Sequence, residues 1–113
     1  MLVIDDDPSI RTLYATVLED EGYRVTTATQ GQDGLDQLAC RPDLILLDLM
    51  MPVMDGREFL IQLRRRAAHR DTPVLVMTAS QVAATPTGAQ AVMRKPFDVR
   101  ALVDRVSGLL ATA

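Results

Sequence analysis

The chain has 113 residues, of which 48% are hydrophobic and 24% charged, and its formal net charge is −3. This length fits a single domain over residues 1–113 that folds without disulfides, and no apolar run reaches the roughly 18 residues that a membrane span needs. The acidic balance disfavours direct nucleic-acid binding, which depends on many phosphate-neutralising cations. The single cysteine, Cys40, excludes an internal disulfide. Since no export signal precedes the first apolar run either, we expect a cytoplasmic protein.

The N-terminal stretch predicts a strand, an acidic turn and a helix. Leu2–Ile4 is a short apolar run of strand-forming residues, and the acidic triplet of residues 5–7 follows it. Asp7 is suited to cap a helix, and Pro8 is suited to be its first residue. Apolar residues then recur at helical spacing until Gly22, which predicts the end of this helix.

A second strand and helix are predicted next, followed by the most apolar strand of the chain. Tyr23–Thr27 alternates as a strand near a sheet edge does, and a helix begins at Thr29 or Gly31 and ends before Pro42. Residues 44–47 are four consecutive apolar residues, a pattern typical of a strand buried on both faces at the centre of a parallel sheet.

Asp48 ends this central strand, and a helix is predicted from about Arg57 to Ala68. The basic cluster of residues 64–66 and 70 falls at the end of that helix. Cations are stabilised there by the helix macrodipole, so the cluster is interpreted as a solvated helix end. His69, which has no second histidine or cysteine beside it for a metal, is interpreted as structural.

The last third of the chain contains two more strands and a helix. Val74–Met77 is again continuously apolar and is followed by Thr78. Ala91–Arg94 predicts a short strand that ends at Lys95, and a final amphipathic helix is predicted over about Val99–Leu110.

Strands that alternate with helices along the whole chain predict an α/β fold, a small doubly wound sheet of five parallel strands. In such a sheet every strand points its carboxyl end to the same edge, where ligands bind. Residues far apart in sequence are therefore expected to meet in one site: Asp5, Asp6, Asp48, Thr78 and Lys95.

The chemistry of these side chains predicts phosphoryl transfer. Three carboxylates in one partly desolvated site repel each other unless a cation lies between them, and a hard, oxygen-liganded ion such as Mg²⁺ suits them. Lys95 supplies a compact positive charge for Asp48 or a phosphoryl oxygen, and the hydroxyl of Thr78 can donate to the same group. The set amounts to an Asp nucleophile without a conventional general base.

Four motifs now carry a resemblance that extends over essentially the whole chain. They are Val3–Pro8, Asp43–Pro52 with Asp55–Gly56 beyond it, Pro73–Ala79, and Lys95–Phe97. In this order and spacing the sequence resembles the receiver domain of two-component response regulators, whose fold is flavodoxin-like.

The resemblance implies a role for each site residue. Asp48 would be the phosphoacceptor, Asp6 a direct Mg²⁺ ligand, and Asp5 would act mainly through metal-bound water. The carbonyl of Met50 would complete the protein ligands. Thr78 and Lys95 would contact the phosphoryl oxygens, the small Ala79 would leave room for that group, and the Lys95–Pro96 peptide bond would be cis.

The same resemblance implies the partners. A sensor histidine kinase or a phosphotransfer protein would supply the phosphoryl group, and a downstream output protein or domain would receive the signal. The protein would not be an enzyme in the usual sense, since it would catalyse only its own phosphorylation and dephosphorylation.

Two positions depart from the family pattern. The family usually has Tyr or Phe three residues before the lysine, where this chain has Val92. The segment Ala79–Gly88 is shorter than usual and contains Pro86, so the fourth helix is expected to be shortened or missing. We therefore expect phosphorylation to act mainly by ordering this segment, in a protein that is a monomer or a weak dimer.

Two alternatives remain open. The pattern of Asp5 and Asp7 after a first strand also suits a small phosphatase of the haloacid dehalogenase type, with Asp5 as nucleophile. A degenerate receiver that serves only as a docking module is the other alternative, and the missing aromatic residue keeps it in consideration. Phosphotransfer to Asp48 distinguishes all three.

Overall fold

The structure is a computed structural model that describes residues 1–49, 51, 54–79, 86, 88–95 and 98–111. Its centre is a sheet of five parallel strands in the order β2-β1-β3-β4-β5. This order confirms the predicted doubly wound sheet. The strands are β1 (Leu2–Ile4), β2 (Thr26–Ala28), β3 (Ile45–Asp48), β4 (Val74–Thr78) and β5 (Ala91–Arg94).

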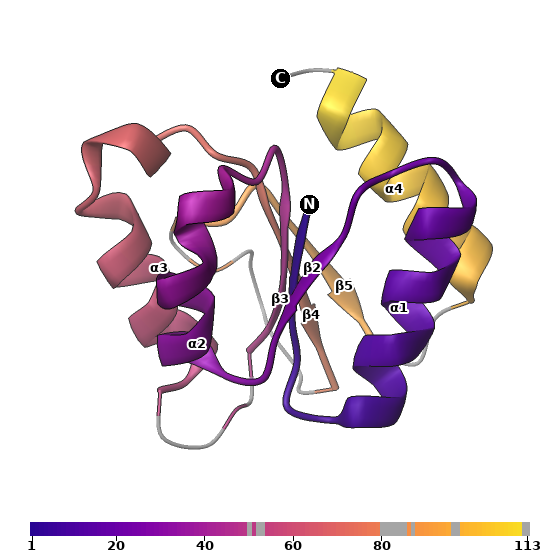
Figure 1. The fold of residues 1–113 in the computed structure, drawn as a ribbon, viewed down its shortest axis with the longest axis horizontal. Helices are drawn as coiled ribbons and strands as arrows, with labels where there is room; N and C mark the ends of the chain where they lie inside the picture. Colours follow the sequence, from indigo (N-terminus) through magenta and orange to yellow (C-terminus); the bar gives the residue numbers. More distant parts are fainter. Residues whose placement is uncertain (50, 52–53, 80–85, 87, 96–97, 112–113) are drawn as a thin grey trace.

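Helices cover both faces of the sheet (Figure 1). On one face α1 lies beside α4, and on the other α2 lies beside α3. The described residues between β4 and β5, which are 79, 86 and 88–90, contain no helix, in agreement with a shortened or missing fourth helix. The helices are α1 (Pro8–Asp20), α2 (Gly31–Asp36), α3 (Gly56–Arg64) and α4 (Val99–Ala111), and the 3₁₀ turns are η1 (Gln37–Cys40) and η2 (Ala67–His69).

Among the described residues, the core consists of two apolar clusters, one on each side of the sheet. The cluster under α2 and α3 contains Phe59, which is fully buried, and the cluster under α1 and α4 contains Leu18 and Leu102. Every residue of β3 is buried, as the unbroken apolar run predicted. Full burial of a Leu or Phe side chain contributes about 1.5–3 kcal/mol, so the central strands form a rigid base for the residues at their ends.

Two predicted boundaries were wrong. The strand predicted over Tyr23–Thr27 runs over Thr26–Ala28, because its partner β1 begins only at Leu2, which pairs with Thr26. The helix predicted to reach Ala68 ends at Arg64, after which Arg66 is extended and η2 forms a separate turn.

The interpretation of the basic cluster as a solvated helix end was wrong for Arg64. Its guanidinium group is half-buried and donates hydrogen bonds to the backbone carbonyls of His69, Thr72 and Gly88. The chain after α3 turns back so that these carbonyls reach the guanidinium, which explains the early end of the helix. Arg65 and Arg66 are exposed, as predicted.

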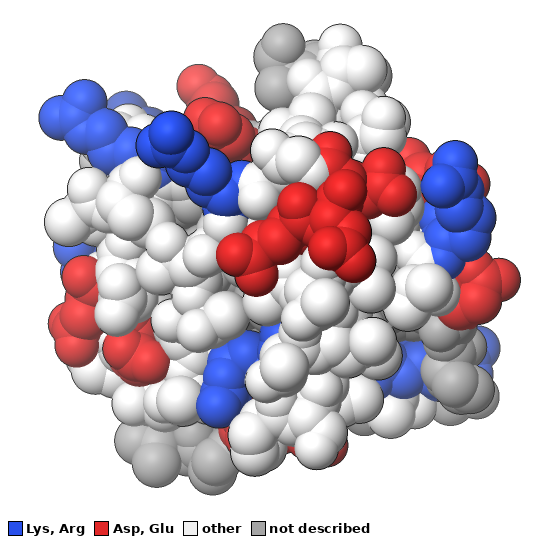
Figure 2. All heavy atoms as spheres, turned by 45° about the vertical axis from the view of Figure 1, so that its right-hand side comes forward, with Lys and Arg blue, Asp and Glu red and all other residues white. Residues whose placement is uncertain are grey.

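Local chemistry at the ends of α1 is asymmetric. The Asp7 carboxylate caps the start by accepting hydrogen bonds from the backbone N–H groups of Ser9 and Ile10, as predicted. The last turn has no basic residue, and acidic side chains gather on this part of the surface (Figure 2), where the chain carries Glu19–Glu21.

No helix in the described part of the chain is long and apolar enough to cross a membrane.

Candidate functional site

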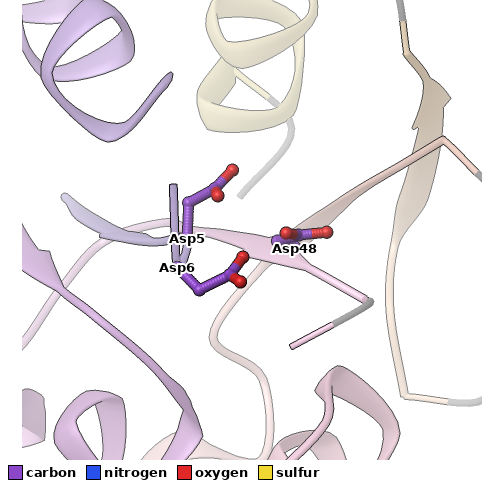
Figure 3. Close-up of side chains that lie close together, drawn as sticks. All are labelled: Asp5, Asp6 and Asp48. Carbon is purple, nitrogen blue, oxygen red and sulfur yellow. The ribbon is translucent and has the colours of Figure 1, made fainter. Parts of the chain in front are cut away.

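Three carboxylates meet at the carboxyl edge of the sheet. Asp5 and Asp6 follow β1, and Asp48 is the last residue of the neighbouring strand β3. One carboxylate oxygen from each lies within 4.8 Å of the others, and the Asp6 side chain points toward Asp48 (Figure 3). The sequence predicted this grouping, because Asp5 and Asp6 follow one buried strand and Asp48 ends another.

Lys95 brings one positive charge to the group. Its Nζ lies 3.1 Å from Asp5 Oδ2 and 3.9 Å from Asp48 Oδ2. The ammonium group is thus nearer to Asp5 than to Asp48, the partner that the sequence suggested. The backbone N–H of Lys95 donates to the Thr78 carbonyl over 2.7 Å, which fixes the end of β5 against the end of β4.

Burial differs sharply among these side chains. Asp5 and Thr78 are 0% exposed and Asp48 is 6% exposed, whereas Asp6 is exposed. The pKa of Tyr14 on α1 is raised to about 12, first by burial of its side chain and then by the negative charges of Asp5 and Asp48. The charge of the site therefore also acts on a residue of the core. One ammonium group balances only one of three carboxylates, so the site keeps an excess of negative charge.

The acidic turn is held from several sides. The backbone N–H of Asp5 donates to the Ala28 carbonyl over 3.2 Å, and the backbone N–H of Asp7 donates to Asp5 Oδ1 over 3.0 Å. Sequence reasoning missed a third partner, Arg11, whose Nη1 donates to the Asp5 carbonyl over 2.7 Å. The signal was available: a long side chain in the first turns of a helix points back toward the helix N-terminus, and α1 begins beside Asp5.

Several predicted features lie outside the described residues. These are the Met50 carbonyl, the geometry of the Lys95–Pro96 bond, and residues 80–85 and 87 of the short segment. Ala79 is exposed directly after Thr78. Val92, at the position of the expected aromatic residue, is only partly buried and packs on the core cluster under α2 and α3.

Comparisons with known proteins agree on one family. The family model for the response regulator receiver domain matches residues 1–107. The DNA-binding dual master transcriptional regulator RpaA of Synechocystis sp. is 40% identical over 116 residues, which cover 97% of this chain and 48% of RpaA. The response regulator SaeR of Staphylococcus aureus is 34% identical over 97% of this chain and 50% of SaeR. The chain therefore spans about half the length of these curated relatives.

Solved structures with the same fold include two close matches. The chemotaxis protein CheY4 of Vibrio cholerae superposes with a TM-score of 0.88 at 33% identity, over 94% of this chain and 93% of that one. The receiver domain of NtrX from Brucella abortus gives a TM-score of 0.88 at 30% identity, over 99% of this chain and 98% of that one.

Proposed function

Because the chain belongs to the response regulator receiver domain family, we propose that it is a single receiver domain in which Asp48 accepts a phosphoryl group. The observation that carries the proposal is the grouping of three carboxylates within 4.8 Å at the end of the most buried strand, with one lysine against them. Such a group has the charge and the position for a metal-dependent phosphoryl acceptor.

The donor set fits Mg²⁺. The residues that would hold the ion are Asp6 and Asp48, with Asp5 acting through water and the Met50 carbonyl as a further oxygen donor. All are hard oxygen ligands, and three carboxylates with one ammonium leave a charge that a divalent ion balances. When bound, the ion supplies positive charge that offsets the charge of the incoming phosphoryl oxygens.

The residues of this chain then have distinct tasks. An Asp48 oxygen attacks the phosphorus of a phosphohistidine, the phosphorus–nitrogen bond breaks, and its electron pair stays on the departing imidazole. Asp48 becomes an acyl phosphate. Lys95, now 3.9 Å from Asp48, and the Thr78 hydroxyl would hold the new phosphoryl oxygens at the ends of β5 and β4.

The partners follow from this chemistry. A sensor histidine kinase or a phosphotransfer protein would present the phosphohistidine, and an output protein or domain would respond to the phosphorylated state. The protein would catalyse only its own phosphorylation and dephosphorylation. With Val92 on β5, which has no ring to exchange between exposed and buried positions, the response would be transmitted mainly through the segment of residues 79–90.

The test is phosphorylation by acetyl phosphate with Mg²⁺, read out by intact mass. Wild type should gain the mass of one phosphoryl group, and both chelation of Mg²⁺ and Asp48→Asn should abolish the gain. Asp5→Asn is the matched control for the phosphatase alternative. If Asp48→Asn keeps the phosphoryl group and Asp5→Asn loses it, Asp5 is the nucleophile and the proposal fails.

One observation already disfavours Asp5 as nucleophile. Its side chain is fully buried, Oδ1 accepts from the Asp7 N–H, and Oδ2 is paired with Lys95 at 3.1 Å. An attacking carboxylate needs an oxygen with access to the substrate. A wild-type chain that gains no phosphoryl mass with Mg²⁺ and a small-molecule donor would favour the docking-module alternative instead.

A further inference from the structure

Arg11 is the one cation besides Lys95 that the described structure bonds to the acidic turn, and it bonds to backbone rather than to a carboxylate. We propose that Arg11 is a positioning residue: by holding the Asp5 carbonyl it sets the direction of the following residue, Asp6, toward Asp48. The inference rests on the proposed function and names a residue that supports the metal ligands without touching the ion.

The first step is that Asp5 is held at four points. Its N–H donates to the Ala28 carbonyl, its carbonyl accepts from Arg11, Oδ1 accepts from the Asp7 N–H, and Oδ2 accepts from Lys95. Three of these bonds are made by residues within the sheet edge or the turn itself. Of the four, only the bond from Arg11 reaches Asp5 from α1, so it fixes the Asp5 carbonyl relative to the helix.

The second step is that Asp6 has no comparable support. Its side chain is exposed and makes no hydrogen bond or ion pair with another described residue, although it contributes an oxygen to the group of three carboxylates. Its direction therefore depends on the peptide that precedes it, whose carbonyl is the acceptor of Arg11. A charge-assisted bond of 2.7 Å to the carbonyl of the fully buried Asp5 is strong enough to define that peptide plane.

The third step separates positioning from simple charge. As a nearby cation, Arg11 opposes the binding of Mg²⁺, so its removal should tighten binding if charge is all that matters. As a positioning residue it promotes binding, so its removal should weaken it. Loss of an outer residue that orients metal ligands costs about 10- to 100-fold in metal affinity. The two explanations thus predict opposite signs.

The experiment is a calorimetric titration of the full chain with Mg²⁺ alone, for wild type, Arg11→Met and Arg11→Lys. We expect Arg11→Met to bind Mg²⁺ about tenfold or more weakly than wild type. Arg11→Lys, which keeps a charged donor, should recover part of the loss. Arg24→Met is the matched control, because it removes the same charge from the amino end of β2, away from the site, and should bind Mg²⁺ as wild type does.

Two outcomes overturn the inference. One is Arg11→Met binding Mg²⁺ as tightly as wild type or more tightly, and the other is Arg11→Lys binding no better than Arg11→Met. Urea unfolding of each variant shows whether it is folded. If Arg11→Met does not fold, the test is the comparison of Arg11→Lys with wild type, in which the inference requires Arg11→Lys to bind Mg²⁺ more weakly. A wild-type chain that itself binds no Mg²⁺ is a failure of the proposed function, which is a different result.

Discussion

The two edges of the sheet handle charge in opposite ways. At the carboxyl edge, three aspartates share one nearby lysine, and two of the three are buried. At the amino edge, Arg64 of α3 makes five hydrogen bonds to described residues that lie before β4 and β5. One edge keeps an excess of negative charge, whereas the other uses a positive charge to close its own structure.

Details of the amino edge show how complete that closure is. The Arg64 guanidinium donates to the carbonyls of His69 at 2.7 Å and Thr72 at 2.8 Å, to the carbonyl of Gly88, and to the side-chain oxygen of Gln90. That same Gln90 oxygen accepts from the N–H of Val74 at 2.6 Å. Burial lowers the pKa of Arg64, but arginine stays charged at any ordinary pH. The hydrogen bonds of this edge support stability, whereas the other edge carries the proposed phosphorylation site.

The largest expected effect is therefore at the amino edge. Arg64→Met should destabilise the protein by about 2–3 kcal/mol, because a charged donor is lost and half-buried carbonyls are left without a partner. The neighbouring Arg65→Met, which removes an exposed side chain, should stay within about 0.5 kcal/mol of wild type. Urea unfolding measures both changes.

The same pair of variants tests whether the two edges of the sheet are independent of each other. The two edges are separated by the length of a strand, about 15 Å for five residues, which is more than the Debye length at physiological salt. Mg²⁺ affinity should consequently be unchanged in Arg64→Met. A clear change in affinity, absent from Arg65→Met, would mean that the edges are coupled through α3.

Sequence reasoning found the carboxyl edge and largely missed the amino edge, for a physical reason. Asp48 and Thr78 each follow a run of apolar residues and Lys95 follows the predicted strand Ala91–Arg94, so these strands also determine the places of the three residues in the sheet. Arg64 and Arg11 act instead on backbone carbonyls. Every residue has a carbonyl, and nothing in the sequence marks the ones that come within reach of Arg64, whereas for Arg11 the direction of a side chain near a helix start was the one signal.

The boundaries that were mispredicted have the same origin. The pattern of α3 continues as far as Ala68, but the helix ends at Arg64 because the carbonyls of the following turn bind its guanidinium. The start of β2 depends on where β1 begins, which is a property of the pair and not of either segment. Local patterns predicted that the elements exist, and tertiary contacts decided where they end.

The second expected effect tests packing at the carboxyl edge. In Gly56→Ala the new Cβ would lie 2.7 Å from the Cα of Leu49 and 2.9 Å from the carbonyl oxygen of Asp48. Both are backbone atoms next to the site, so the chain must shift, at a cost of about 2 kcal/mol.

Gly108→Ala is the matched control for this substitution. The Cβ added at this position, inside α4, would lie in open space with no neighbouring side chain or other element within 4 Å. The substitution should therefore stabilise the protein by about 0.5–1 kcal/mol, because alanine has the higher helix propensity. Unfolding measurements should give opposite signs for the two substitutions. Equal effects on the free energy of unfolding would show that the backbone at the carboxyl edge accommodates the added Cβ without cost.

A third, smaller effect tests whether the carboxyl edge is under electrostatic strain. Asp6→Asn removes one of three carboxylates that lie within 4.8 Å, so without Mg²⁺ it should stabilise the protein by about 1 kcal/mol at low salt. With Mg²⁺ the order should reverse, because the variant loses a proposed ligand and gains little stability from the ion.

Asp43→Asn is the control for Asp6→Asn. This exposed aspartate lies before β3 at the amino edge, so its removal should change neither the stability without Mg²⁺ nor the response to the ion. The interpretation is wrong if Asp6→Asn destabilises the protein without Mg²⁺, or if its effect is the same at high salt, where repulsion between exposed charges is screened.

The smallest expected effect is a pH dependence at the amino edge. Burial first, and then Arg66, Arg41 and Arg64, lower the pKa of His69 from its ordinary value of 6.5, and its Nδ1 lies 3.2 Å from Thr72 Oγ1. Asp36 and Asp43 line the adjacent surface cavities. The unfolded chain therefore binds a proton more readily than the folded one does. The stability that His69 contributes is complete above pH 6.5 and is lost as the pH falls through the lower folded pKa.

His69→Gln removes this titration while leaving a polar group near Thr72. Between pH 7 and 5 wild type should lose slightly more stability than His69→Gln, in a series of urea unfolding curves. The difference is small, because the ring is only partly buried and solvent screens the arginines. Arg66→Met should reduce the difference, since Arg66 is the largest of the three charged causes. If His69→Gln and wild type lose stability in parallel, the neutral imidazole has no part in the stability of the amino edge, and Arg64 with its acceptors accounts for it.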